Sequence, residues 1–427
     1  MKKFFLAVLC VTALLGLAAC SRVIETYGSP MITTTPLPTA SPVPAATPEP
    51  TPEPTPEPTP EPSEAEPVEL TLTNNVRASM KLIQDDYEYS GVTLYGGTVI
   101  HVESETPFAS LYLYWSRTPK PYTVEGENFT LAGGEYGMLH EYLLLPESVT
   151  SLDLEFTGSS SLMELWAFTE GRPPEGVQVW DPPCEKADLL VFSAHSDDDV
   201  IFFGALIADS VARGLDVQVC YLVDHALPGG YQYADRNHEL LNALWAMGVR
   251  HYPRVGPFPD YFVDNLWAAQ KQYGDISVTN YMVDILREFR PSVVVTHDRE
   301  GEYGHGTHML CAMCMERAVE QAADEKIQPK SASAYGTWDT PKLYLHYADE
   351  NPIMLEVEVP LDYFGGRSAF QVAQDAMEYH LSQLQWAHRP QLDNEAFERY
   401  DCRCFGLVRS TVGADTTNDI MENIPRE

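Results

Sequence analysis

Apolar and polar residues alternate along the first folded part of the chain. Between residues 68 and 178, short segments such as "SLYLYWS" and "SLDLEFTG" place apolar residues at every second position, and Gly, Pro, Asn and Asp fall between the segments. A period of two is typical of strands that bury one face. The pattern therefore predicts an all-β sandwich accessory domain over residues 68–178.

From residue 185 to residue 427 the pattern changes. Continuous apolar runs such as "ADLLVFSA", "DVQVCYLV" and "SVVVTH" alternate with segments of helical spacing such as "VIFFGALIADSVARG". Strands that are apolar throughout are covered on both faces, and strands that alternate with helices form parallel sheets. We therefore predict an α/β domain over residues 185–427, with a mostly parallel sheet and helices on both faces.

The N-terminus has the shape of a signal peptide. Lys2 and Lys3 precede the apolar run 4–17, which is too short for a comfortable membrane span, and the sequence "LAAC" ends at Cys20. "LAAC" resembles the bacterial lipobox. The resemblance implies cleavage before Cys20 and lipidation of its thiol, so that residues 1–20 are a lipoprotein signal peptide. A plain secretory signal with an incidental cysteine is the alternative.

Residues 21–67 follow this signal as a predicted disordered stalk. Proline, threonine and glutamate dominate residues 36–67, which contain no aromatic residue, and Thr-Pro-Glu-Pro repeats fill residues 47–62. Such a composition cannot form a core and favours extended polyproline II. Together with the lipid anchor, the stalk predicts a folded part held at the extracellular face of a bacterial cell membrane.

Charge and cysteine content narrow the classes of partner. The formal net charge is −35, which argues against a nucleic-acid partner because phosphates attract Lys and Arg. The eight cysteines do not resemble a disulfide framework. Cys311 and Cys314 form a Cys-x-x-Cys pair within a segment of helical spacing, where packing of an apolar helix face is favoured over a zinc site.

Aromatic residues in the predicted sandwich offer two interpretations. Tyr112, Tyr114 and Trp115 could stack on sugar rings if they were exposed. A place in the sandwich core is the favoured interpretation.

Polar clusters follow two of the buried strands. His195, Asp197 and Asp198 follow one strand, and His305 and His308 follow another. Because the carboxyl ends of parallel strands share one edge of a sheet, we expect the two clusters to meet. The pairs His195 with Asp198 and His305 with His308 are each three residues apart and can project to one side. Two imidazoles and one carboxylate form a zinc site with an open position, although other divalent ions accept the same ligands.

A free carboxylate beside such a metal can act as a base. Zinc lowers the pKa of water to about 7, and Asp197 could take the proton as hydroxide attacks a carbonyl carbon. A second histidine could stabilise the oxyanion and protonate the leaving amine. Taken singly, Asp197 or Asp198 could be a helix cap, and His297 a satisfied surface residue at a strand end. Two clusters on one edge favour a metal-dependent hydrolytic site.

These motifs resemble a known family. "AHSDDD" is similar to the Ala-His-Pro-Asp-Asp-Glu signature of the PIG-L/LmbE-like zinc de-N-acetylases, and "GEYGHGTH" is similar to the family's His-x-x-His segment. "RNHELLNALWAMG", "PFPD" and "HLSQ" also resemble the family, and the resemblance covers about residues 186–425. It implies a Rossmann-like fold and hydrolysis of an N-acetyl group, usually on an amino sugar. It further implies roles for six residues: His195, Asp198 and His308 as zinc ligands, Asp197 as general base, His305 as oxyanion stabiliser and general acid, and Arg236 as a substrate contact.

Four positions depart from the family's pattern. Ser196 replaces a proline, Asp199 replaces a glutamate that supports the site, and Gly306 and Thr307 replace the usual residues between the two histidines. None of these changes removes a ligand or the base. They bear on rate and substrate and leave metal binding in place.

Two functions therefore stand as hypotheses. The first is a surface-anchored zinc hydrolase that removes acetate from an N-acetylated sugar in a glycan or glycoconjugate. The alternative is a catalytically inactive glycan-binding lipoprotein. Asp197 favours the first, because binding alone needs no base beside a metal. A weaker third possibility is another hydrolase on the same edge, such as an esterase.

Overall fold

The structure is a computed structural model that describes residues 63–231, 233–386, 388–392 and 400–425. The predicted signal peptide, its lipidation site Cys20 and residues 21–62 of the predicted stalk lie outside the described residues. Within the ranges just given, no helix is both long and apolar enough to cross a bilayer.

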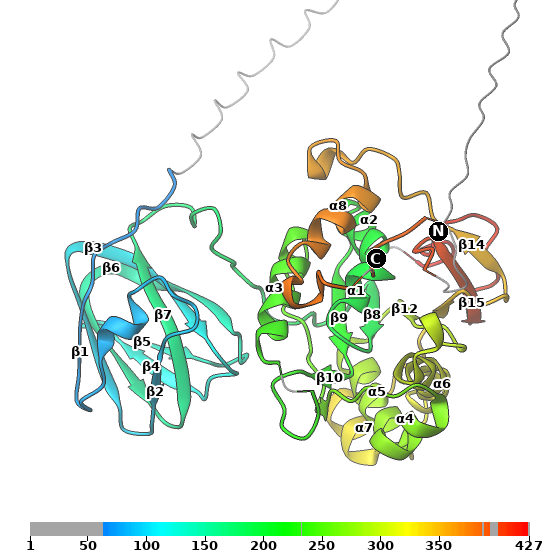
Figure 1. The fold of residues 1–427 in the computed structure, drawn as a ribbon, viewed down its shortest axis with the longest axis horizontal. Helices are drawn as coiled ribbons and strands as arrows, with labels where there is room; N and C mark the ends of the chain where they lie inside the picture. Colours follow the sequence, from blue (N-terminus) through cyan, green and yellow to red (C-terminus); the bar gives the residue numbers. More distant parts are fainter. Residues whose placement is uncertain (1–62, 232, 387, 393–399, 426–427) are drawn as a thin grey trace, which may run out of the picture. The chain divides into compact units, whose positions relative to one another are not determined.

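Seven antiparallel strands form the first part of the described chain (Figure 1). They are hydrogen-bonded in the order β2-β7-β3-β6-β4-β5, and β1 pairs with β3. The predicted alternation is visible in β4, where Tyr122 and Val124 are buried and Glu125 is exposed. The elements are β1 (Thr71–Asn74), η1 (Met80–Ile83), β2 (Val92–Leu94), β3 (Val99–Trp115), β4 (Tyr122–Glu125), β5 (Thr130–Gly133), β6 (His140–Phe156) and β7 (Ser160–Phe168).

Hydrogen bonds join these strands into one sheet, so the predicted two-sheet sandwich is not confirmed. The long strands β3 and β6 pair over two stretches, with one shift of register between Glu103 and Phe108 and a second between Phe108 and Ser110. Tyr112, Tyr114 and Trp115 in β3 are all buried. Trp115 belongs to the main hydrophobic core, Tyr112 packs in a small cluster with Phe168, and Tyr114 stacks on His238. The idea that they offer an exposed sugar-binding surface is therefore wrong, and a place in the core is confirmed for Trp115 and Tyr112.

Strands and helices alternate in the second part, which confirms the α/β prediction (Figure 1). Its main sheet has the order β14-β15-β13-β12-β8-β9. Strands β9, β8, β12 and β13 are parallel, whereas β15 runs antiparallel to β13 and β14, so the sheet is mixed. These strands are β8 (Leu189–Ser193), β9 (Val217–Tyr221), β12 (Val293–Thr296), β13 (Lys342–His346), β14 (Pro352–Met354) and β15 (Cys404–Ser410), and the short strands β10 (Val223–Asp224) and β11 (Phe258–Pro259) pair with each other.

Helices cover both faces of this sheet. In β8, Leu189 and Val191 pack in a cluster with α2, α3 and α8, whereas Leu190 and Phe192 pack with α5 and α6. Both faces of β8 are therefore buried under apolar side chains, as the continuous apolar run predicts. The helices are α1 (Asp198–Ile201), α2 (Gly204–Ala212), α3 (Asp235–Ala246), α4 (Leu266–Tyr273), α5 (Asp275–Phe289), η2 (Glu302–Gly304), α6 (Gly306–Gln321), α7 (Pro329–Tyr335), η3 (Asp362–Phe364), α8 (Ala369–Met377) and η4 (Leu381–Gln383).

The sheet order explains where the polar clusters meet. Strands β8 and β12 are parallel neighbours, with Leu189 opposite Val293. The loops that leave β8 for α1 and β12 for α6 therefore begin at the same edge of the sheet. Cys311 and Cys314 are buried within α6, with free thiols.

Candidate metal centre

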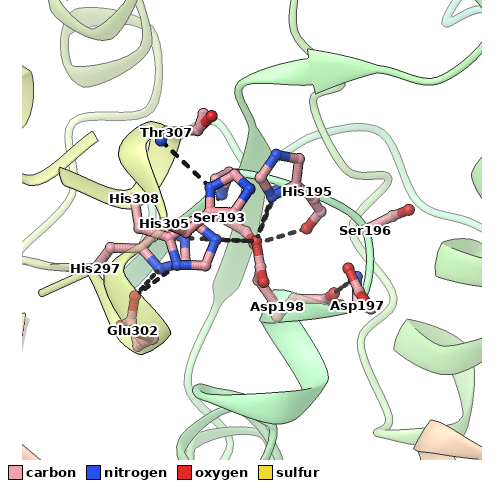
Figure 2. Close-up of polar contacts among 12 residues, drawn as sticks. Ser193, His195, Ser196, Asp197, Asp198, His297, Glu302, His305, Thr307 and His308 are labelled. Atoms are coloured by element: carbon pink, nitrogen blue, oxygen red, sulfur yellow. Dashed lines mark hydrogen bonds and ion pairs between the residues drawn. The ribbon is translucent and has the colours of Figure 1, made fainter. Parts of the chain in front are cut away.

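The two polar clusters meet at the carboxylate of Asp198 (Figure 2). Asp198 begins α1, and its Oδ2 lies 2.8 Å from Nδ1 of His195. The same oxygen lies 3.0 Å from Nε2 of His308, in the first turn of α6. The three predicted ligands are thus brought together from two loops at the edge of the sheet.

The donor atoms around this oxygen fit a divalent cation. Two groups of three buried residues could each hold a cation, because the donor atoms within each group all lie within 4.8 Å of one another. One group is His195, His305 and His308, and the other is Asp198, His297 and His308. Imidazole nitrogens and carboxylate oxygens are ligands of zinc and of several other divalent ions. His308 belongs to both groups. The hydrogen bonds that the other residues make distinguish candidate ligands from residues that only lie nearby.

Glu302 fixes the orientation of His308. Its buried carboxylate accepts hydrogen bonds from Nδ1 of His308 at 2.7 Å, Nδ1 of His297 at 2.9 Å and Nδ1 of His346 at 2.7 Å. A proton on Nδ1 leaves Nε2 of His308 facing Asp198, where it makes no hydrogen bond within the described part of the chain. Carboxylates that hold metal-binding histidines in this way are a recurrent feature of metal sites.

This position favours positive charge. Burial lowers the pKa of His308, but the carboxylates of Asp198 and Glu302 outweigh it and raise that pKa to about 10. Burial raises the pKa of Asp198, yet His308 and His195 hold it well below its usual value. A site that attracts a proton so strongly between two carboxylates also suits a metal cation.

His297 is not the surface residue that a lone histidine at a strand end suggested. Its ring is buried, and the interpretation as a surface residue is wrong. Nδ1 lies 2.9 Å from Glu302 Oε2, and Nε2 accepts a hydrogen bond from the backbone N–H of Ala194 at 2.9 Å. Both ring nitrogens are occupied, so His297 supports the site without offering a donor to a metal.

Asp197 lies beside this cluster without joining it. Its backbone φ of 153° is unusual for a residue with a side chain, and it directs the carboxylate into a cavity. Oδ1 accepts a hydrogen bond from Nη2 of Arg236 at 2.7 Å. Burial raises the pKa of Asp197 to about 6, even though the charge of Arg236 opposes this rise. The side chain makes no hydrogen bond that caps α1, so the capping interpretation of Asp197 is wrong.

Two departures from the family's pattern have structural counterparts. The N–H of Ser196 donates to Nε2 of His225 at 3.3 Å, a contact that proline could not make. Asp199 is buried, accepts a hydrogen bond from the N–H of Asp197 at 3.0 Å and accepts another from the hydroxyl of Tyr221 at 2.9 Å. The shorter aspartate therefore still supports the turn that carries Asp197.

His305 precedes α6 and lines the cavity. Its Nδ1 accepts a hydrogen bond from the N–H of Thr307 at 3.3 Å, which assigns the ring proton to Nε2. Burial and the neighbouring rings of His308 and His195 lower its pKa to about 2. His305 is therefore a neutral hydrogen-bond donor at neutral pH, which suits stabilisation of an oxyanion.

Arg236 and Asp260 form one wall of the cavity. Nη2 of Arg236 also donates to the backbone oxygen of Ser196 at 2.7 Å, and Nη1 lies 3.7 Å from Asp260 Oδ2. Asp260 lies 3.1 Å from Nδ1 of His225 and 3.7 Å from Nε2 of His195. Burial raises the pKa of Asp260, but the contact with His225 and the charges of His195 and Arg236 lower it to about 2.

The cavity at this edge has a volume of about 860 Å³. A cavity near the upper end of the roughly 300–1,000 Å³ range of small-molecule sites has room for an extended ligand. It is lined by His195, Asp197, Tyr231, Tyr233, Arg236, Asp260, Phe262, Tyr303, His305, Leu381, Ser382, Gln383, Gln385, Trp386 and His388.

Sequence reasoning gave no role to three buried residues of the site. Asp260 lay within "PFPD" and Glu302 within "GEYG", and each was a single acid with no partner at a telling spacing. His346 comes from β13, the strand after α7, and reaches Glu302 because β13 lies beside β12. An acid directly upstream of two closely spaced histidines was the only signal for Glu302.

One protein-family model matches this region of the chain. Residues 190–321 match the PIG-L family, described as GlcNAc-PI de-N-acetylase. The match includes the predicted ligands, Asp197, Arg236 and His305, together with Asp260 and Glu302.

Curated relatives carry related names. The chain is 32% identical over 200 residues to 1D-myo-inositol 2-acetamido-2-deoxy-alpha-D-glucopyranoside deacetylase 1 of Catenulispora acidiphila, covering 42% of this chain and 61% of that protein. It is 34% identical over 185 residues to the corresponding deacetylase of Mycolicibacterium gilvum, covering 38% and 59%. The chain thus spans about three-fifths of the length of these relatives.

A solved structure is similar over part of the chain. It is the N,N'-diacetylchitobiose deacetylase of Pyrococcus horikoshii, at 18% identity, with a TM-score of 0.36 and coverage of 46% of this chain and 71% of that one.

Proposed function

We propose that this chain, whose residues 190–321 form a PIG-L domain, is a zinc-dependent hydrolase that removes an N-acetyl group from an amino sugar in a glycan or glycoconjugate. The observation that carries the proposal is the convergence of His195, Asp198 and His308 beside the carboxylate of Asp197, which Arg236 holds at the cavity. The curated relatives are named as deacetylases of an acetamido sugar, which supports the same reaction.

In this proposal His195, Asp198 and His308 hold the metal. When bound, a divalent cation supplies Lewis acidity that polarises the amide carbonyl and makes water more acidic. Glu302 holds the ring of His308 in place through Nδ1, and Asp260 lies beside the outer nitrogen of His195.

Asp197 takes the proton of the attacking water. Its carboxylate faces the cavity, and a pKa of about 6 leaves it ionised at neutral pH yet basic enough to accept a proton. Arg236 holds the carboxylate by a charge-assisted hydrogen bond of 2.7 Å, and Asp199 holds the backbone.

His305 donates from Nε2 to the carbonyl oxygen as negative charge develops there. As the C–N bond breaks, the proton held by Asp197 passes to the nitrogen, directly or through His305. The products are acetate and a free amine, which balances the hydrolysis.

The fold and location belong to the same proposal. Four parallel strands with helices on both faces support a Rossmann-like domain. The signal-like residues 1–20, Cys20 and the proline-rich stalk support a lipid-anchored protein at the extracellular face of a bacterial membrane. The inactive glycan-binding alternative finds no support, because a base held by Arg236 and Asp199 serves no purpose in binding alone.

The direct test is an assay for free amine and acetate with N-acetylglucosamine oligomers and zinc-loaded protein. We expect release by the unaltered protein and at least a hundredfold loss of kcat in Asp197→Asn with zinc retained. Equal release by both proteins would contradict the assignment of the base. Release from O-acetyl but not N-acetyl sugars would replace the proposal with an esterase.

A further inference from the structure

Aromatic rings surround the mouth of the cavity. Tyr231, Phe262 and Trp386 line it and have 68%, 66% and 56% of their surface exposed. They come from three separate segments: the loop before α3, the segment after β11 and the segment after η4. Large exposed rings are unfavourable in water, and when they gather on one opening they mark a binding surface.

The segment that carries Trp386 is anchored to α3, the helix that also carries Arg236. Ser382, in η4, donates from its backbone N–H to Glu239 Oε1 at 2.8 Å and from its hydroxyl to Glu239 Oε2 at 2.6 Å. Glu239 lies on α3, one turn after Arg236, which bonds Asp197. Tyr231, Phe262 and Trp386 together form an aromatic rim. The same helix therefore positions both the proposed catalytic base and one side of this rim.

The lining of the cavity matches a ligand with apolar faces and polar edges. Between the rings it presents the side chains of Ser382, Gln383 and Gln385, and the charges of Asp197 and Asp260 are offset in part by Arg236, which also lines the cavity. The net charge of −35 disfavours an anionic ligand. Sugar rings combine C–H faces that stack on aromatic rings with hydroxyl groups that bond amides and carboxylates. A single sugar would fill only part of about 860 Å³.

We propose that the cavity binds an uncharged oligosaccharide of two or more units, with the N-acetylated unit at the metal centre and a neighbouring ring stacked on Trp386. This proposal rests on the proposed function and deepens it by naming the substrate class. Tyr231 and Phe262 complete the aromatic surface around the same neighbouring unit. The rim thereby selects for chain length, while the metal centre performs the hydrolysis.

The test compares substrates of one, two and four N-acetylglucosamine units. In the unaltered protein, kcat/KM is expected to rise about tenfold from one unit to four, which corresponds to one well-stacked ring. Trp386→Ala is expected to lose more on the tetramer than on the monomer, chiefly through KM, and Trp386→Phe to retain most of the rise. The matched control is Trp267→Ala, because Trp267 on α4 is 69% exposed and does not line the cavity.

Equal kcat/KM for all three lengths would overturn the proposal, as would equal losses in Trp386→Ala and Trp267→Ala. If no variant releases acetate, the proposed reaction fails, and binding of the tetramer measured by calorimetry then tests the rim alone. Binding that Trp386→Ala weakens about tenfold, and Trp267→Ala does not, supports the rim in that case. Absence of tetramer binding overturns it.

Discussion

The carboxylate of Glu302 lies 2.7 Å from Nδ1 of His308, on the side of the ring opposite Asp198. The same carboxylate holds His297 and His346, so one buried acid orients three histidines: one directly after β12, one at the end of β13 and one in α6. Figure 2 shows how this arrangement turns Nε2 of His308 toward Asp198. The candidate site therefore depends on a buried residue that does not line the cavity.

Glu302→Gln is expected to weaken zinc binding by about 10- to 100-fold, because an amide cannot accept hydrogen bonds from all three rings. Competition with a coloured chelator measures the Kd without relying on activity. Glu325→Gln, at an exposed position, is the matched control. Unchanged Kd in the Glu302 variant, with native circular dichroism, would show that His308 needs no such support.

His305 and His308 are expected to differ in metal binding, although both rings lie within reach of His195. His308→Ala should lose stoichiometric zinc, whereas His305→Ala should retain it and lose at least a hundredfold in kcat. Elemental analysis after dialysis measures the metal. Loss of zinc from His305→Ala instead would make His305 a ligand.

Gly306→Ala is expected to weaken both zinc binding and activity. A Cβ at residue 306 would lie 2.3 Å from the backbone oxygen of Asn265, so the first turn of α6 would have to shift, and His308 with it. Glu320→Ala, on the exposed face of the same helix, is the control. A crystal structure of Gly306→Ala with α6 unmoved and zinc affinity intact would contradict this view.

Protonation of His140 in β6 is expected to lower the free energy of unfolding in acid. Its ring bonds Gln178 Oε1 at 2.7 Å and His238 Nδ1 at 2.9 Å, and burial lowers its pKa to about 4. The unfolded chain binds the proton first, near pH 6.5, so the stabilising contribution is complete above pH 6.5 and falls, by about 3 kcal/mol, as pH drops toward 4.

Urea unfolding at several pH values measures this effect as a difference between proteins. The free energy of unfolding should fall less between pH 6.5 and 4 in His140→Gln than in the unaltered protein. His101→Gln is the control, because His101 is partly exposed and its bond to Asp153 raises its pKa. Parallel curves for the unaltered protein and His140→Gln would refute the assignment.

Cys20→Ala is expected to move the full chain from the membrane fraction to the soluble fraction of cells that express it. The expectation follows from the resemblance of "LAAC" to a lipobox, since the thiol of Cys20 would carry the lipid. Metabolic labelling with a radioactive fatty acid measures the modification directly. A label that persists in Cys20→Ala would place the anchor elsewhere.

Much of the site was predictable because it lies where two apolar runs end. The runs that became β8 and β12 are dry on both faces, and polar clusters at their carboxyl ends had to share an edge once the strands paired in parallel. Spacing within "AHSDDD" and "GHGTH" then indicated two histidine-containing pairs on that edge, and the resemblance to the PIG-L/LmbE-like family implied His195, Asp198 and His308 as the ligands.

Other parts could not be read from local patterns. His346 and Asp260 reach the centre through pairing of β13 with β12 and through the fold of a loop, which no short-range spacing encodes. The β-rich part forms one sheet because β3 and β6 continue through shifts of register, where alternation alone suggested two sheets. The aromatic rim joins three distant segments, so its residues share no motif.

The most direct test of the metal centre is anomalous diffraction from crystals of residues 63–427 grown with zinc. We expect one peak about 2.0–2.2 Å from a nitrogen of His195, a nitrogen of His308 and an oxygen of Asp198, with the carboxylate of Asp197 nearby and not coordinated. A peak held by other residues, or none at saturating zinc, would contradict it.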